Sequence, residues 1–257
     1  MRRRRQALLI AAAIAAVSGQ VFVFYVPGPS PPLIATITGS AVGLSFLAAG
    51  IAAWLRWPAS RLGLLFTLVG YFWLLPAVGH LPYPLPSAIS NVTAGLYGAA
   101  LAHLGLAWPT GRLRSRFEVG VVIAEYTWSI GQSVAYLAFW NPLTAGCSCP
   151  ANLMLIDGSS SMDNIIDVLS IPVGIALTGI VLVLIVRHWQ TARGWTRRAM
   201  LPLLWIAPAI CALQAVQTVA GNTNLAIFGS DTARNILYGY LPLILLGARP
   251  CSWPAPC

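Results

Sequence analysis

An acid and an imidazole lie inside two neighbouring apolar segments, and they are the first candidates for chemistry in this chain. Glu125 lies within residues 119–140, and His103 lies within residues 88–108. A carboxylate inside a membrane costs about 2.5–3.5 kcal/mol, so it normally faces the interior of a helix bundle and finds a partner. At a rise of about 1.5 Å per residue, both side chains lie roughly 9–12 Å from the same surface. The sequence predicts that His103 and Glu125 form a buried pair, which either responds to protons or serves only as a structural interhelical hydrogen bond.

Two thiols lie close together in the polar segment 141–163. Cys147 and Cys149 are separated by one residue, and we expect this segment on the outer face, where oxidising conditions favour disulfides. A bridge across one residue makes a strained and reducible ring, which has the chemistry of a redox sensor. Stapling of the loop, or two free thiols, is the plainer alternative. Two ligands do not complete a closed zinc site, which takes four, so we expect no metal here.

The common catalytic motifs are missing from the sequence. A phosphate-binding P-loop needs a Lys, whereas all fifteen basic residues are Arg. The GxGxxG, HExxH and GxSxG patterns are absent as well. Six acidic residues and three His leave little material for another active site. We therefore expect no enzyme activity, no catalytic residue and no cofactor on this chain.

Long apolar segments must position these residues. The chain is 58% hydrophobic and 8% charged, whereas a soluble domain carries about 25% charged residues. Eight segments have the apolar character of membrane-crossing helices, the last of them short: residues 6–26, 33–55, 62–78, 88–108, 119–140, 165–186, 199–220 and 235–248. In the second, Gly39 and Gly43 form a GxxxG pattern, which predicts close helix packing. The predicted fold class is all-α, a polytopic transmembrane helix bundle of about eight spans, with residues 1–248 as one membrane domain and 249–257 as an irregular tail.

Arginines cluster in every second connection between these segments, and this alternation predicts the orientation. Arg2 to Arg5 precede the first segment, whereas connections such as PGPSPP carry no basic residue. Short Arg-rich loops stay on the cytoplasmic side, so we expect a multi-pass protein of the cell membrane with a cytoplasmic N-terminus. The first segment is longer than a signal-peptide core of about 7–15 residues, so we expect it to remain uncleaved. The net charge of +9 lies in short juxtamembrane loops, which favours anionic lipid headgroups as partners and not nucleic acid.

Four strings in the connections resemble motifs of one protein family. RWPASRLGLLFTLVG follows the second segment, and CSCPANLMLI lies in the outer connection. RHWQTARGWTRRAMLP lies in the longest inner connection, and HLGLAWPTGRLRSRFE, with Pro109, Gly111, Arg112 and Arg116, closes the fourth segment. In this order the strings resemble the N-terminal membrane domains of sensor histidine kinases from high-GC bacteria, over residues 58–247. The PTGRLRSR string is the most specific of them.

The resemblance implies a sensory input domain of a two-component signalling system, which forms a homodimer and changes its helix packing in response to a signal. In that family, a dimerisation helix with the phosphoacceptor His and an ATP-binding domain follow the last membrane helix. LPLILLGARPCSWPAPC matches the family only through Gly247, so we expect a truncated or frameshifted input domain, which would reach a response regulator only with a kinase core. His103 and His188 match membrane-loop positions and are not phosphoacceptors. The alternative is a small transporter or channel-like protein, with Glu125, His103 and the Gln residues along a path.

Overall fold

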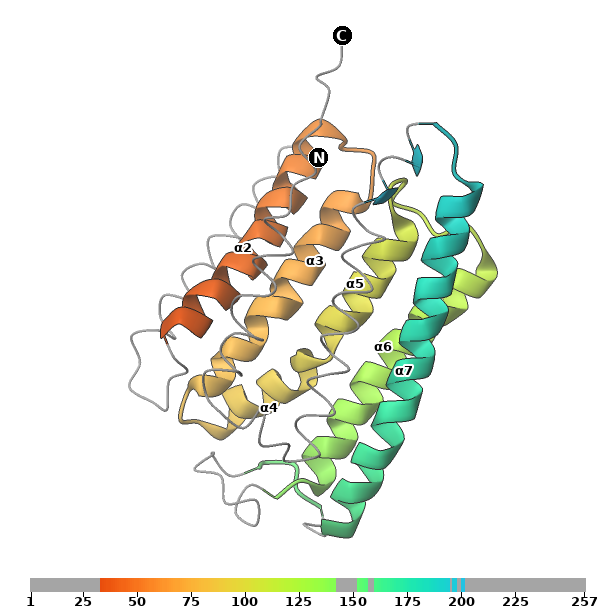
Figure 1. Ribbon diagram of the computed structural model, residues 1–257. Coiled ribbons are helices and arrows are strands. Elements are labelled where there is room, and N and C mark those ends of the chain that lie inside the picture. Colours follow the sequence, from red (N-terminus) through yellow and green to blue (C-terminus); the bar gives the residue numbers. More distant parts are fainter. Residues whose placement is uncertain (1–32, 142–151, 157–159, 195, 198–199, 202–257) are drawn as a thin grey trace.

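The described part of the chain is a layer of helices. A computed structural model describes residues 33–141, 152–156, 160–194, 196–197 and 200–201 (Figure 1). Within these residues every regular element is a helix and none is a strand, which confirms the all-helical class for this part of the chain. The elements in order are α2 (Leu33–Arg56), α3 (Leu62–Leu74), the 3-10 helix η1 (Leu75–His80), α4 (Pro84–Ala94), α5 (Leu96–Ala107), α6 (Arg116–Phe139) and α7 (Ser160–Thr191).

These helices correspond to the second to sixth predicted spans. α2 matches residues 33–55, and α3 together with η1 covers 62–78. α6 contains most of 119–140, and α7 begins earlier than predicted, at Ser160. The first and eighth predicted spans, and nearly all of the seventh, lie outside the described residues.

The fourth predicted span is interrupted at Gly95. The sequence predicts one helix over residues 88–108, whereas α4 and α5 are separate and short. In the last turn of α4, the Thr93 hydroxyl donates to the carbonyl oxygen of Ile89 at 2.7 Å, a contact that competes with the regular helix ladder. Gly95 lies against Ser129 of α6, where an added Cβ would lie 3.4 Å from the Ser129 side chain. A glycine therefore lets the chain change direction while it stays close to α6.

Three described stretches are long and apolar enough to cross a membrane. They are Gly39–Arg56, Leu62–Gly79 and Val168–Thr191, and they indicate a membrane protein. The sequence predicts eight spans, and some of them lie outside the described residues. Within the described residues, two physical reasons lower the number further. α4 and α5 are too short by themselves, and α6 carries two carboxylates and several other polar side chains.

The contact between α2 and α3 is a seam of glycines. A Cβ added to Gly50 of α2 would lie 2.9 Å from the carbonyl oxygen of Gly63 in α3, and a Cβ added to Gly70 of α3 would lie 2.9 Å from the carbonyl oxygen of Gly43. Such distances leave no room for a side chain, so the two backbones approach directly, as small residues permit in membrane helices. The close packing predicted for the GxxxG pattern holds for Gly43, whereas a Cβ on Gly39 would meet none of the described residues within 4 Å.

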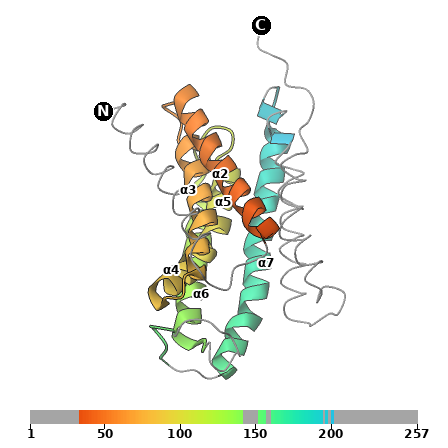
Figure 2. The same ribbon diagram turned by 90° about the vertical axis from the view of Figure 1, so that its left-hand side faces the viewer.

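The other half of the bundle is joined by a small apolar cluster from α5, α6 and α7. Its buried members are Leu106, Val121, Val122, Val181 and Ile185. Figures 1 and 2 show α7 along one edge of the described helices. Much of its apolar surface is exposed, including Val168, Ile175, Val183 and Val186. In a bilayer such a face meets lipid tails at no cost, because lipid is as apolar as these side chains.

Candidate functional site at the arginine-rich end

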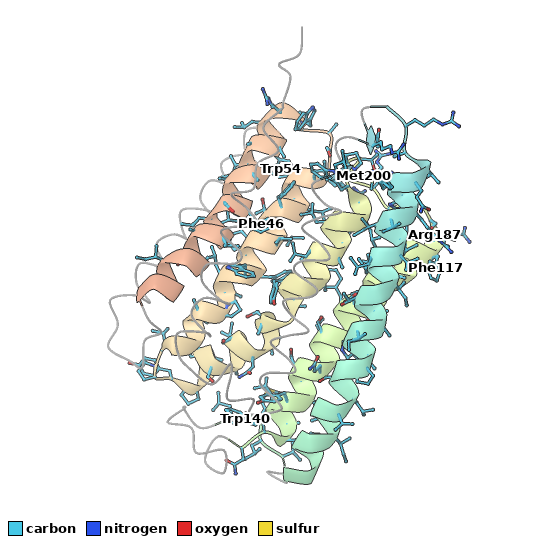
Figure 3. The ribbon with its side chains drawn as sticks, viewed as in Figure 1. Phe46, Trp54, Phe117, Trp140, Arg187 and Met200 are labelled. Atoms are coloured by element: carbon cyan, nitrogen blue, oxygen red, sulfur yellow. The ribbon has the colours of Figure 1, made fainter. Side chains whose placement is uncertain are left out.

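The connection between α2 and α3, the connection between α5 and α6, and the end of α7 all lie at one end of the bundle. Figure 3 shows Trp54 and Met200 toward this end and Trp140 at the opposite one. The arginines at this end are all exposed: Arg56, Arg61, Arg112, Arg114, Arg116, Arg187, Arg193 and Arg197. The structure therefore gathers the described arginines at one surface, as the alternation in the sequence predicts. We call this surface the arginine end.

The connection 108–115 is a compact turn that leans on the α2–α3 connection. The amide of Gly111 donates to the carbonyl oxygen of Ala107 at 2.7 Å, and the Thr110 hydroxyl donates to that of Arg112 at 3.2 Å. Gly111 has a φ of 75°, which disfavours any side chain, and a Cβ there would lie 2.7 Å from the Ser60 hydroxyl oxygen. Gly111 thus serves the packing of two connections, which explains one residue of the predicted loop motif.

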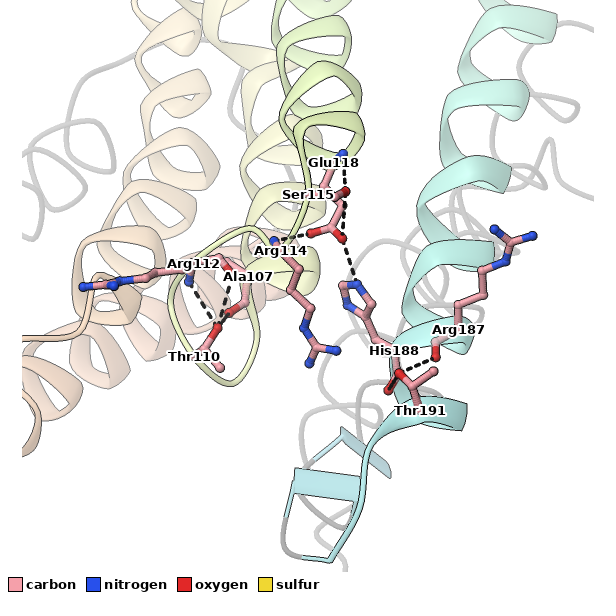
Figure 4. Close-up of polar contacts among 9 residues, drawn as sticks. All are labelled: Ala107, Thr110, Arg112, Arg114, Ser115, Glu118, Arg187, His188 and Thr191. Carbon is pink, nitrogen blue, oxygen red and sulfur yellow. Dashed lines mark hydrogen bonds and ion pairs between the residues drawn. The ribbon is translucent and has the colours of Figure 1, made fainter.

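Glu118 closes the first turn of α6. Ser115 caps the helix by accepting a hydrogen bond from the Glu118 amide at 3.2 Å. The Glu118 carboxylate turns back: Oε2 accepts from the Arg114 amide at 2.7 Å, and Oε1 accepts from the Ser115 hydroxyl at 3.3 Å (Figure 4). This is a variant of the capping box, because the carboxylate accepts from the amide of Arg114, the residue before the cap, and not from that of Ser115. A negative charge at this position also suits the positive end of the helix dipole.

The same carboxylate joins α6 to α7. His188 Nε2 lies 3.0 Å from Glu118 Oε1, with the two side chains 9% and 5% exposed. His188 stands in the last turn of α7, where a positive charge suits the helix dipole. With Nε2 as the donor, this pair links the start of one helix to the end of another, across 70 positions of sequence. The other ring nitrogen, Nδ1, is buried and has no hydrogen-bond partner among the described residues.

The structure places His103 against another side chain of α6 and not in a bond with Glu125. His103 and Glu125 are both half-buried, but no hydrogen bond or ion pair between them is present in the described part of the chain. His103 instead packs edge-on against the ring of Tyr126, with 6.2 Å between the ring centroids. The rise per residue gives the acid and the imidazole the same depth, but successive helical residues are rotated by about 100°. The side chain that faces His103 is therefore that of Tyr126, the residue after Glu125.

The connection between α6 and α7 is described only in part. Cys147 and Cys149 lie outside the described residues, so their pairing stays a prediction. From the same string, the Asn152 side chain donates to the carbonyl oxygens of Leu137 at 2.7 Å and Trp140 at 2.9 Å. These are terminal carbonyls of α6 that lack helical partners. Asn152 thus caps α6 and ties the α6–α7 connection to it.

Two signals in the sequence point to the observed site. Ser115 and Glu118 have the S-x-x-E spacing of a capping box directly before an apolar run, and this spacing fixes where α6 begins. The pattern W-P-x-x-R-L occurs at 57–62 and again at 108–113, in the two connections that meet at Gly111. The partnership of Glu118 with His188 has no comparable local signal, because it depends on how α6 and α7 pack.

The chemistry available to the site is that of charge and hydrogen bonding. Among the described residues, no group of three or more His, Cys, Asp or Glu side chains is arranged to hold a metal. Comparison of the chain with known protein families, with curated proteins and with solved structures gave no match. The described part of the chain thus defines an all-helical protein with three stretches able to cross a membrane and an arginine-rich end.

Proposed function

We propose that the chain is an integral membrane sensory domain of a two-component signalling histidine kinase, with about eight spans and the arginine end in the cytoplasm. The support comes from the arginine distribution, which follows the positive-inside rule, and from the four strings that resemble such domains. The compact turn with Gly111 and Arg112 belongs to the most specific of those strings. By the same resemblance, the domain acts as a homodimer and reaches a response regulator only through a kinase core.

The observation that carries this proposal is the Glu118–His188 pair at the end of α7. α7 contains 32 residues, which correspond to about 48 Å at 1.5 Å per residue. One continuous helix, with Pro172 inside it, therefore connects the outer segment with the arginine end. Near its inner end, the described contacts of α7 include the buried Glu118–His188 pair and a small apolar cluster. A displacement of the outer end of α7 would therefore act on one defined contact at its inner end, the Glu118–His188 pair.

In this proposal the pair has two states, formed and broken. A signal that favours a different position of α7 shifts the balance by its differential affinity for the two positions. When the pair breaks, Glu118 keeps its bonds to Arg114 and Ser115, so α6 remains capped. His188 alone loses its partner, and the end of α7 becomes free to move. The change is thereby confined to α7.

A fusion of the full chain to the dimerisation and ATP-binding domains of a histidine kinase tests the coupling. We expect Glu118→Gln and His188→Gln to change autophosphorylation in membranes by several-fold and in the same direction, because both weaken one contact. Glu125→Gln is the matched control, since it neutralises the other acid of α6 without touching the pair. Unchanged autophosphorylation in both pair variants, with a changed rate in the control, would reject the coupling.

The proposed orientation has a test of its own. Thr110 and Met154 are exposed and belong to opposite ends of the bundle. In a chain whose own cysteines are replaced by Ser, a membrane-impermeant thiol reagent should label Met154→Cys in intact cells and Thr110→Cys only after the membrane is opened. Labelling of Thr110→Cys in intact cells contradicts the orientation.

The transporter alternative has less support. In the described residues, a hollow lined by Asn91, Trp140 and Asn152 has a volume of about 10 Å³, which is at the lower limit for one water molecule. His103 contacts a tyrosine ring and not Glu125. A solute flux in vesicles that Glu125→Gln abolishes would favour the transporter over the sensory domain.

A further inference from the structure

Two connections at the arginine end carry the same pattern and meet each other. Residues 57–62 read WPASRL and residues 108–113 read WPTGRL. They touch where Gly111 packs against Ser60 and the backbone of Arg61: a Cβ on Gly111 would lie 3.0 Å from the Arg61 amide nitrogen. The arginine of the first pattern is therefore adjacent to the glycine that precedes the arginine of the second. Arg61 and Arg112 come from distant parts of the sequence to one edge of the bundle.

Packing beneath the two connections holds them in place. Leu62 is buried in an apolar cluster against which Trp108 and Leu113 also pack. Trp108 meets the ring of Phe66 edge-on, with 6.0 Å between the centroids. Side chains that belong to a packed cluster move little. The two arginines are thus presented from a fixed base.

The charge of these arginines is not neutralised by the described residues. Arg61 and Arg112 are exposed, and neither makes an ion pair with a described carboxylate. At this end the carboxylate of Glu118 is buried against His188. Figure 4 shows Arg112 pointing toward the α2–α3 connection, whereas Arg114 points downward in that view. Positive charge therefore accumulates beside the α2–α3 connection.

Exposed apolar side chains occur close to this charged edge, at the end of α2 and the start of α3. Trp57 is 54% exposed and Leu55 is 59% exposed, and Leu64 in the first turn of α3 is exposed as well. Trp favours the boundary between headgroups and lipid tails. A phosphate held by the arginines would have its acyl chains beside these side chains. A free anion, which has no acyl chains, would not contact these apolar side chains.

We propose that Arg61 and Arg112 form a binding site for the phosphate headgroup of one anionic phospholipid, with its chains along Leu55 and Leu64. Arginine suits this partner, because its planar guanidinium donates two parallel hydrogen bonds to a phosphate. The inference rests on the proposed membrane orientation and adds a specific lipid site to it. It distinguishes these two arginines from the remaining positive charge, which attracts the leaflet without selecting a position.

Lipid retention by the full chain, purified in detergent, tests the site. Native mass spectrometry would count phosphatidylglycerol and phosphatidylcholine molecules bound during titration. We expect one phosphatidylglycerol to bind in preference to phosphatidylcholine, and Arg61→Gln with Arg112→Gln to weaken it on the order of ten- to thirtyfold. The double variant Arg116→Gln with Arg193→Gln removes the same charge from exposed positions and should change the affinity less than about threefold, as expected for distant screened charges.

A charge-conserving variant and a competition with inorganic phosphate distinguish a specific lipid site from a general attraction of charge. Arg61→Lys with Arg112→Lys keeps the charge but not the bidentate geometry, and it should fall between the wild type and the Gln variant. Equal losses in both Gln variants would show a diffuse attraction and overturn the site. Inorganic phosphate that displaces the lipid completely at equal concentration would overturn the role of the acyl chains. Circular dichroism verifies that each variant is folded. Binding in detergent does not depend on orientation, so labelling at Thr110→Cys can fail while the lipid site stands, and the reverse.

Discussion

The α2–α3 contact and the α6–α7 contact are built on opposite principles. Between α2 and α3, Gly50 and Gly63 bring the two backbones together with no room for a side chain. α7 also contains glycines, but a Cβ added to Gly174 or Gly179 would meet no atom of the described residues within 4 Å. α7 is instead held by the buried Glu118–His188 pair and a small apolar cluster at one end.

The difference shows which half of the molecule has freedom to move. A backbone seam has one arrangement, because any sliding brings a larger residue into the place of a glycine. A contact that depends on one polar pair and a few aliphatic side chains has few interactions to exchange when the helix shifts. Local stability follows the density of buried contacts, so α2 and α3 form the fixed part and α7 the movable part of the described bundle.

The largest expected effect comes from removal of the carboxylate that holds α7. Glu118→Ala leaves His188 buried without its partner and also removes two bonds of the capping box. Loss of one partner of a buried pair costs about 3–5 kcal/mol. We expect a decrease of that size in the free energy of unfolding, measured by titration with a denaturing detergent. A decrease below about 1 kcal/mol, the scale of an exposed pair, would mean that the pair does not hold α7.

Glycine substitutions test the comparison directly. Gly50→Ala places a methyl group against the backbone of Gly63, and overpacking of this kind costs about 1–3 kcal/mol. Gly179→Ala on α7 is the matched control, because the methyl group contacts none of the described residues. It should be neutral or stabilising by up to about 1 kcal/mol, since Ala favours helices over Gly. Equal effects of the two substitutions in thermal unfolding would remove the distinction between the two contacts.

A smaller effect is expected from the helix cap of α6. Ser115→Ala removes the acceptor for the Glu118 amide, a loss that costs about 0.5–2 kcal/mol. Ser45→Ala serves as the control, because the Ser45 hydroxyl is exposed on α2 and bonds only within its own turn. Hydrogen exchange should show faster exchange of the first-turn amides of α6 in Ser115→Ala. Exchange that stays unchanged would assign the cap to Glu118 alone.

The smallest expected effect concerns the stack beyond the end of α7. The Arg197 guanidinium lies 4.5 Å from the centroid of the Trp189 ring, and an exposed cation–π contact contributes about 0.5–1 kcal/mol. Arg197→Gln should lower stability by that amount and change the Trp fluorescence. Arg193→Gln removes an exposed charge from the same region and should leave the fluorescence unchanged. A similar change in both variants would show a general effect of charge.

The sequence predicts the helices better than the contacts between them. Apolar length alone places α2 and α3, because any helix of that composition must cover about the same span of bilayer. The break at Gly95 is not visible in hydropathy, since it depends on the approach to Ser129. Hydropathy likewise gives depth but not the direction in which a side chain points. For this reason it pairs His103 with Glu125, whereas the structure pairs His188 with Glu118.

The glycine seam also limits which mutations α2 and α3 can tolerate. Every single-base change that replaces a glycine codon yields a larger residue, so Gly43, Gly50, Gly63 and Gly70 have no conservative neighbour in the genetic code. The outer face of α7, by contrast, accepts exchanges among Val, Ile and Leu with little change in what the lipid meets. A saturation mutagenesis library scored for folding should therefore tolerate almost no substitution at these four glycines of α2 and α3. It should tolerate many substitutions on the exposed face of α7. Variation within the chain is then directed to the helix that we infer to carry the signal.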